Sequence, residues 1–126
     1  MHFKVGTDIC SVSRIEKAHS RFGSKFMERI LTDDEITYVM MRPKRMAETI
    51  AARFAAKEAM SKVLGTGWRG IDWKEVEVTK KRSGEPGLAL HGRAAKRADL
   101  LGLKSFEVSL SHERDYAIAF IIAYGE

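Results

Sequence analysis

The chain has 126 residues, of which 44% are hydrophobic and 31% are charged, a length that suits one domain over residues 1–126 with a modest core. No apolar stretch approaches the roughly 20 residues that cross a bilayer, and the N-terminus lacks the basic and then apolar pattern of a signal peptide, so we expect a cytoplasmic protein without a membrane partner. Lys and Arg outnumber Asp and Glu by 22 to 17, which favours an anionic partner, and the single cysteine excludes an internal disulfide.

The first predicted element is a short strand over residues 3–9 that ends in a carboxylate, after which the chain turns helical. Gly6 allows another backbone to approach this strand closely. An Asp at the end of a strand is a frequent Mg²⁺ ligand, and it is also a frequent residue at the start of a helix. Asp8 is therefore either a metal ligand or a cap.

The helical segment that follows carries basic residues on one side, next to an apolar stripe. Gly23 and Ser24 interrupt the segment, and Ser24 is the expected cap of its second part. The basic side is either an ordinary solvated helix face or a docking face. If the segment is helical, its basic residues project within about 120° of one another. The basic residues are Arg14, Lys17, Arg21, Lys25 and Arg29, and the apolar stripe consists of Ile15, Phe22, Phe26 and Ile30.

A capping box at Thr32 and Glu35 predicts that the next helix begins at residue 33, and Pro43 ends it. The box explains Glu35 fully, so we prefer a structural role for this residue over a catalytic one. A further helix is predicted from Met46 to Leu64, closed by Gly65.

This last helix contains a carboxylate in an apolar setting. Phe54, Glu58 and Lys62 share one broad stripe, because side chains on a helix are separated by about 100°. Burying a carboxylate costs several kcal/mol unless a cation or a metal compensates its charge. The alternative is a plain surface pair between Glu58 and Lys62.

The rest of the chain predicts a hairpin, a short helix and two further strands. The ranges are a loop at 66–70, strands at 76–79 and 88–90 joined by a turn at 83–87, a helix at 93–101 closed by Gly102, and strands at 106–111 and 116–123. We therefore expect an α+β fold in which helices pack on a small antiparallel sheet.

Four stretches in register resemble the holo-acyl-carrier-protein synthases, a family of phosphopantetheinyl transferases. They span nearly the whole chain, which makes chance agreement improbable. The resemblance implies a 4′-phosphopantetheinyl transferase-like fold. The stretches are Gly6-Thr7-Asp8-Ile9 with Ser13-Arg14-Ile15-Glu16; Ile30-Leu31-Thr32 with Glu35; residues 53–59 with Lys62 and Gly65-Thr66-Gly67; and Ser109-Leu110-Ser111-His112 before Tyr116-Ala117.

The resemblance implies Mg²⁺-dependent transfer of 4′-phosphopantetheine from coenzyme A to a serine of apo acyl carrier protein, releasing adenosine 3′,5′-bisphosphate and supporting fatty acid biosynthesis. Asp8 and Glu58 would hold Mg²⁺, and Lys62 would stabilise the leaving phosphate, so these three are the expected catalytic residues. The serine proton would pass to Glu58 or to a metal-bound water, and the sequence leaves both open.

The resemblance also implies residues that contact the two substrates. The acidic helix of the carrier protein would dock on Arg14, Arg21 and Lys25. Ser109 and Ser111 would share one face of a strand, where both hydroxyls could donate to phosphate oxygens. The expected contacts to coenzyme A are Arg53, Phe54, Gly65, Thr66, Gly67, Lys81, Pro86, Ser109, Ser111 and His112.

Two departures from the usual family pattern have consequences. Ser11 stands where many members have an acid, so the metal shell would rely more on water. Phe54 stands where the larger phosphopantetheinyl transferases have Trp, which places the chain in the compact subgroup. Members of that subgroup are homotrimers that bind coenzyme A in clefts between subunits.

The alternative from another class is a noncatalytic basic module that binds RNA or DNA. It leaves Asp8 and Glu58 unexplained, and the chain lacks aromatic residues at the spacing of RNA-binding modules. No Gly-x-x-x-x-Gly-Lys-Ser/Thr stretch is present, which argues against a P-loop hydrolase. We therefore expect coenzyme A, apo acyl carrier protein and further copies of the chain as partners, and no nucleic acid.

Overall fold

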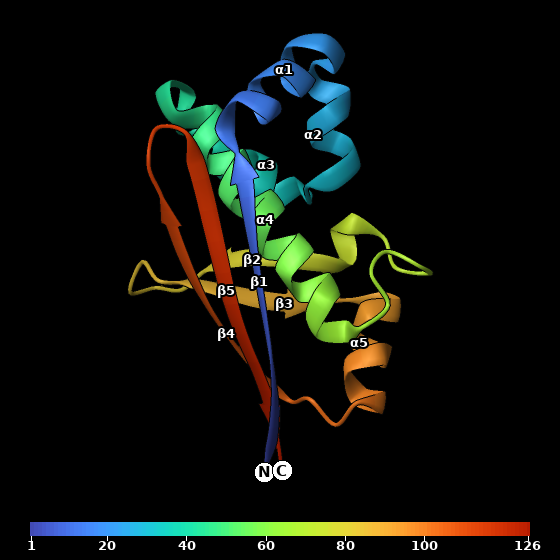
Figure 1. Cartoon of the computed structure of the whole chain (residues 1–126). Coiled ribbons are helices and arrows are strands. Elements are labelled where there is room, and N and C mark those ends of the chain that lie inside the picture. The colour runs from blue at the N-terminus through green and yellow to red at the C-terminus, as the bar shows by residue number, and fades with distance from the viewer.

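A computed structural model describes residues 1–126, and its α+β class is the predicted one (Figure 1). None of the helices is long and apolar enough to cross a membrane. In chain order the elements are β1 (His2–Ser11), α1 (Val12–Phe22), α2 (Ser24–Ile30), α3 (Asp33–Met40), the 3₁₀ helix η1 (Pro43–Arg45), α4 (Met46–Leu64), the 3₁₀ helix η2 (Trp73–Glu75), β2 (Val76–Lys80), β3 (Pro86–Leu90), α5 (Gly92–Leu100), β4 (Ser105–His112) and β5 (Tyr116–Gly125).

The strands form two antiparallel sheets, a three-stranded sheet with the order β1-β5-β4 and the two-stranded hairpin β2-β3. The first and last strands of the chain pair along their full length, from His2 opposite Gly125 to Ser11 opposite Tyr116. Both termini therefore lie together at one end of the molecule (Figure 1).

Helix α4 packs on one face of the three-stranded sheet, and small side chains line the contact. Ala55 and Ala59 of α4 are completely buried, as are Ala117 and Ala119 of β5. Because alanine has no side chain beyond Cβ, the helix backbone lies close to the strands. The opposite face of the sheet carries the alternate residues of each strand and is exposed.

The closest approach is at Gly6, as its position in the first strand predicted. A Cβ atom at Gly6 would collide with the carbonyl oxygen of Ala59 and with the side chain of Val63. Only glycine fits between β1 and α4 at this point. The contact places Asp8, two residues further along β1, beside the C-terminal half of α4.

The start of α1 differs from the prediction. β1 continues to Ser11, and the Ser11 hydroxyl accepts a hydrogen bond from the backbone N–H of Arg14 at 3.4 Å. Ser11 is therefore the cap of α1, and Asp8 lies inside the strand. The predicted break between α1 and α2 is present, but its cap is Gly23, with φ of 63°, and Ser24 makes no capping hydrogen bond.

One other prediction needs correction. Pro86 and Gly87 belong to β3 instead of the turn before it, because Lys80 pairs with Pro86 in the hairpin register.

The interruption expected at Gly23 divides the apolar stripe between α1 and α2. Phe22, at the end of α1, is 55% exposed.

A buried ion pair joins α3 to α4. The Lys57 ammonium has no exposed surface and donates to Glu35 Oε1 at 2.8 Å, to the carbonyl oxygen of Trp73 at 3.1 Å and to that of Val76. Burial lowers the pKa of Lys57, and the negative charge of Glu35 opposes that shift.

The Glu35 carboxylate is equally well satisfied. It accepts from the backbone N–H of Thr32 at 2.8 Å, which completes the predicted capping box, and from the N–H of Val78 at 2.9 Å. The pair and its hydrogen bonds therefore connect α3, α4, η2 and β2, which is more than the capping box alone implied.

We expect Glu35→Ala to lower the free energy of unfolding by about 3–5 kcal/mol, because it leaves the Lys57 charge buried without its partner. Urea unfolding followed by circular dichroism measures this change. Asp34→Ala is the matched control, since Asp34 is exposed on the same helix and its loss is expected to cost less than about 0.5 kcal/mol. Equal effects of the two substitutions would contradict the structural role.

Candidate active site

Asp8 and Lys62 form an ion pair between β1 and α4. Lys62 Nζ donates to Asp8 Oδ1 at 3.0 Å and to the carbonyl oxygen of Thr7 at 2.9 Å. Glu58 lies one helical turn before Lys62 on α4, but no ion pair joins the two. The surface pair considered from the sequence is therefore wrong, and Lys62 is directed to the strand.

Glu58 is half-buried and has one hydrogen-bond donor. Its Oε1 atom accepts from the indole N–H of Trp68 at 3.2 Å, and Oε2 has no donor from the protein. The Trp68 ring stacks on Trp73 with a centroid separation of 4.0 Å, and Trp73 stacks on Phe54 at 4.9 Å. An aromatic cluster therefore lies beside the carboxylate.

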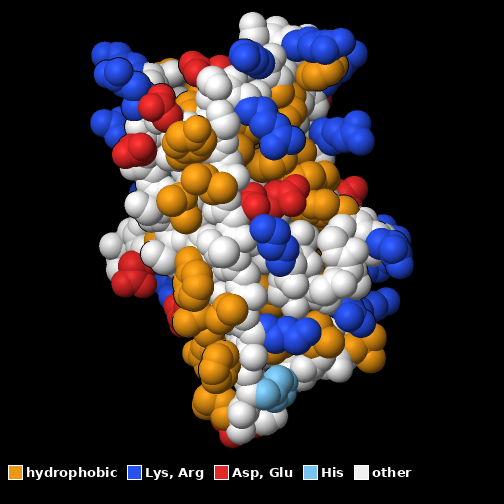
Figure 2. Space-filling view, viewed as in Figure 1, with side chains coloured by type: hydrophobic (Ala, Val, Ile, Leu, Met, Phe, Trp, Pro, Cys, Tyr) orange, Lys and Arg blue, Asp and Glu red, His pale blue; other side chains and the backbone are white.

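The negative charges of Asp8 and Glu58 both act on the buried thiol of Cys10. Burial raises the pKa of the Cys10 thiol; Arg14 lowers it, and the negative charges of Asp8 and Glu58 raise it further. Both acids and Arg14 thus act on the same buried atom. Figure 2 shows acidic side chains in the middle of this face next to a basic one, with further Lys and Arg side chains above them, over α1 and α2.

The donor set at this position fits a hard cation that shares its shell with a substrate. No group of three or more His, Cys, Asp or Glu side chains in the chain could hold a metal ion. Asp8 and Glu58 supply two carboxylates, and Mg²⁺ is commonly bound by one or two carboxylates together with phosphate oxygens and waters. The free Oε2 atom of Glu58 is available for such a ligand bond.

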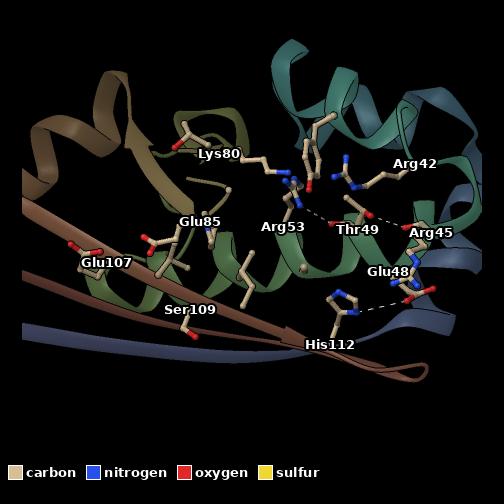
Figure 3. Close-up of a pocket in the computed structure, with 17 residues that line it drawn as sticks. Arg42, Arg45, Glu48, Thr49, Arg53, Lys80, Glu85, Glu107, Ser109 and His112 are labelled. Atoms are coloured by element: carbon tan, nitrogen blue, oxygen red, sulfur yellow. Dashed lines mark hydrogen bonds and ion pairs between the residues drawn. The ribbon is translucent and has the colours of Figure 1, made fainter. Parts of the chain in front are cut away.

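A second feature is a cavity of about 470 Å³ near the N-terminal half of α4, between α3, β3 and β4 (Figure 3). Tyr38 lies in the wall of this cavity, and three cations surround its ring. Arg42 Cζ lies 4.0 Å, Arg53 Cζ 4.2 Å and Lys80 Nζ 5.0 Å from the ring centroid. Burial by itself raises the pKa of Tyr38, but the hydrogen bond with Lys80 and the two arginines outweigh it and lower the pKa.

Arg53 contains the one buried side-chain nitrogen or oxygen atom without a hydrogen-bond partner. This atom is Nε, while the terminal Nη1 donates to the carbonyl oxygen of Thr49 at 3.5 Å. Burial lowers the pKa of Arg53, and Tyr38 opposes the shift. An unpaired donor among converging cations is suited to an anionic ligand such as a phosphate.

The structure divides the residues predicted to contact coenzyme A into three groups. Arg53, Pro86, Ser109 and His112 line the cavity, although the Ser109 hydroxyl points away from the cations (Figure 3). Gly65, Thr66 and Gly67 follow the other end of α4, about 18 Å from Arg53 along the helix.

The remaining predicted contacts lie outside the cavity lining. Phe54 belongs to the aromatic cluster, and Ser111 is exposed on the outer face of the sheet. Lys81 pairs with Glu107 at 3.6 Å and with Glu85 at 3.9 Å, both of which line the cavity.

Several residues of both regions were not predicted from the sequence. Neither Arg42 nor Arg45 was singled out beside the helix end at Pro43, and Lys81 was predicted instead of its neighbour Lys80. The alternation of β2 could have indicated Lys80, since it separates the two lysines onto different faces. No sequence pattern indicated a role for Trp68 or Trp73. Their contacts with Phe54 and Glu58 join residues far apart in the sequence, and their contact with each other depends on the conformation of the segment between them.

The predicted docking residues Arg14, Arg21 and Lys25 are all exposed on α1 and α2. Arg14 also reaches the candidate site, with Cζ 5.7 Å from the centroid of the Phe54 ring. The basic surface and the carboxylates are therefore adjacent.

Comparison with known proteins identifies the family. A model of the 4′-phosphopantetheinyl transferase superfamily matches residues 4–121. The chain belongs to this superfamily. The holo-[acyl-carrier-protein] synthase of Gloeobacter violaceus is 40% identical over 97% of this chain and 92% of its own, and that of Solibacter usitatus is 45% identical over 93% and 94%.

Solved structures of superfamily members confirm the predicted fold. The Helicobacter pylori synthase in complex with coenzyme A aligns with a TM-score of 0.83 and 33% identity, covering 96% of this chain and 100% of that chain. The Bacillus anthracis synthase in complex with CoA (3′,5′-ADP) aligns with a TM-score of 0.79 and 33% identity, covering 97% and 96%.

Proposed function

We propose that the protein is a holo-acyl-carrier-protein synthase. It transfers 4′-phosphopantetheine from coenzyme A to a serine of apo acyl carrier protein, and adenosine 3′,5′-bisphosphate leaves. The observation that carries this proposal is the ion pair of Asp8 with Lys62 at the junction of β1 and α4, one helical turn from Glu58, in a chain 40–45% identical to relatives with this name. The cytoplasmic location and the role in fatty acid biosynthesis remain predictions from the sequence.

The reaction requires stabilisation of charge on a pyrophosphate. The serine oxygen forms a bond to the phosphorus that carries pantetheine, and the bond from that phosphorus to the bridging oxygen breaks, so the electron pair stays with the 5′-phosphate of the leaving nucleotide. Mg²⁺ held by Asp8 and Glu58 would neutralise part of this charge. Lys62 supplies a second cation, whose ammonium already lies 3.0 Å from Asp8 Oδ1.

The serine proton needs an acceptor near the attacking oxygen. Glu58 has a carboxylate oxygen without a protein donor, so it can take the proton directly or through a water.

We propose that the cavity around Arg53 binds the nucleotide end of coenzyme A. Arg42, Arg53 and Lys80 converge there, and the unpaired Arg53 Nε is available to a phosphate oxygen. The carrier protein then docks on Arg14, Arg21 and Lys25, where its acidic helix can place the serine close to Glu58.

We also propose that the active form is a homotrimer with substrate sites between copies. The outer face of the three-stranded sheet exposes a row of large apolar side chains, and Figure 2 shows hydrophobic atoms in a column over β1 and β5. Monomers rarely leave such a continuous patch uncovered. The exposed residues are Phe3, Val5, Ile9, Tyr116, Ile118, Phe120 and Ile122.

The separation of the predicted coenzyme A contacts between the cavity and the 65–67 loop also supports a trimer with sites between copies. Ser109 and Glu107 line the cavity from β4, and Phe120 lies opposite Ser109 in the sheet, so the cavity borders the apolar face. A second copy packed on that face could bring the 65–67 loop of one chain near the cavity of its neighbour.

Transfer is tested by mass spectrometry of apo acyl carrier protein incubated with coenzyme A, Mg²⁺ and the protein. We expect a mass gain of one phosphopantetheine that EDTA prevents. Glu58→Ala and Asp8→Ala should each reduce the rate by about 100-fold or more, since each removes charge stabilisation from the reacting phosphates. Asp99→Ala removes an exposed acid on α5 and is the control. A folded protein that binds coenzyme A and modifies no carrier would contradict the reaction.

Steady-state kinetics should distinguish the surface that binds the carrier protein from the cavity that binds coenzyme A. We expect Arg21→Ala to raise KM for the carrier protein about tenfold with little change in KM for coenzyme A, and Arg53→Ala to do the reverse, because each removes a charged hydrogen-bond donor from one surface. Lys104→Ala makes the same change in net charge at an exposed site outside both surfaces. Parallel changes in both KM values would count against the assignment.

The assembly is tested by light scattering coupled to gel filtration. We expect three times the chain mass for the wild type, and monomers with weakened coenzyme A binding for Phe120→Lys, because a charge cannot be buried in an apolar interface without a partner. Leu100→Lys is the control, since Leu100 is 81% exposed on α5. A monomeric wild type would overturn the trimer.

A further inference from the structure

Glu58 depends on one donor for its orientation. The carboxylate torsion of a glutamate is broad, so a group without partners samples many orientations. In this protein Lys62 pairs with Asp8, and the one protein hydrogen bond to the Glu58 carboxylate comes from Trp68 Nε1, at 3.2 Å to Oε1. The hydrogen bond to Oε1 therefore also determines the direction in which Oε2 points.

Trp68 is itself fixed by stacking. Its ring lies 4.0 Å from that of Trp73, with the planes inclined by 26°, and Trp73 lies 4.9 Å from Phe54 at 29°. The stack begins at Phe54 on α4, and its last ring, Trp68, returns to the same helix by donating to Glu58, one turn after Phe54. The cluster closes the loop after Gly65 back onto α4.

The stack is anchored in the core by the buried ion pair. The carbonyl oxygen of Trp73 accepts from Lys57 Nζ at 3.1 Å, and Lys57 is held by Glu35. A continuous series of contacts therefore runs from the core through Trp73 and Trp68 to the Glu58 carboxylate.

We infer that Trp68 is a positioning residue for Glu58: its N–H holds one carboxylate oxygen and leaves the other for the cation and the phosphates. The inference rests on the proposed function, in which Glu58 binds Mg²⁺. An indole N–H is a donor only, so it can neither bind a metal ion nor accept a proton, and its effect passes through Glu58. Partners of this kind commonly change metal affinity by 10–100-fold.

Two replacements separate the N–H from the ring. Trp68→Phe keeps an aromatic ring for the stack on Trp73 but loses the donor. β-(3-Benzothienyl)alanine at position 68 keeps the full bicyclic ring and has sulfur in place of the N–H. We expect both replacements to weaken Mn²⁺ binding, measured by electron paramagnetic resonance with saturating coenzyme A, by about tenfold. Coenzyme A affinity in EDTA should stay as in the wild type.

The outcomes are distinct. Unchanged Mn²⁺ affinity in the benzothienyl protein would overturn the inference even if Trp68→Phe binds weakly, because the ring and not the N–H would then matter. This comparison also decides the case if Trp68→Phe melts well below the wild type.

Glu58→Ala separates this inference from the proposed function. If the wild type binds no Mn²⁺, or Glu58→Ala binds it equally well, the proposed metal site fails and the role of Trp68 with it. If Glu58→Ala weakens binding and the Trp68 replacements do not, the inference alone fails. In the expected case, Trp68→Phe adds no further loss in the Glu58→Ala protein, since it acts through that carboxylate.

Discussion

The contact between the backbones of β1 and α4 places Asp8 against the turn of α4 that carries the other charged groups of the candidate site. At Gly6 the strand has no side chain, and the space that a Cβ atom would need is taken by the carbonyl oxygen of Ala59 and by Val63. The alanines of α4 and β5 continue this close packing on both sides. Asp8 therefore reaches the turn of α4 that contains Glu58 and Lys62, and the ion pair of Asp8 with Lys62 follows from this geometry.

Helix α4 then separates two kinds of electrostatic environment. Its C-terminal half carries Glu58 and Lys62 and lies beside Asp8 of β1, a set that suits a cation and a pyrophosphate. Its N-terminal half borders a cavity with converging cations and an unpaired Arg53 nitrogen, which suits a nucleotide phosphate. Coenzyme A has both a pyrophosphate and a nucleotide phosphate, so the proposed activity accounts for the two regions together.

The core contributes to the site through the Glu35–Lys57 pair. A fully buried lysine must find acceptors for its three N–H groups, and two of these acceptors are main-chain carbonyls at and after η2. This requirement fixes the η2 segment, whose Trp73 ring supports Trp68. A stabilising interaction of the core is thus connected through Trp73 and Trp68 to the Glu58 carboxylate.

The sequence alone determined the features that depend on neighbours in the chain. The capping box at Thr32, the helix from Met46 to Leu64 and the alternation in the strands are local, and all of them are present. Motifs at the right spacing also identified the family and marked Asp8, Glu58 and Lys62.

Only the tertiary structure decided which of these elements meet. The pairing of β1 with β5 joins opposite ends of the chain, and neither strand carries a local signal for its partner. The burial of Lys57, the cations around Tyr38 and the hydrogen bond from Trp68 to Glu58 likewise join residues on different elements. The physical reason is that periodicity and capping report which face of an element is apolar and where the element ends, whereas the partner of a polar group depends on how those faces pack together.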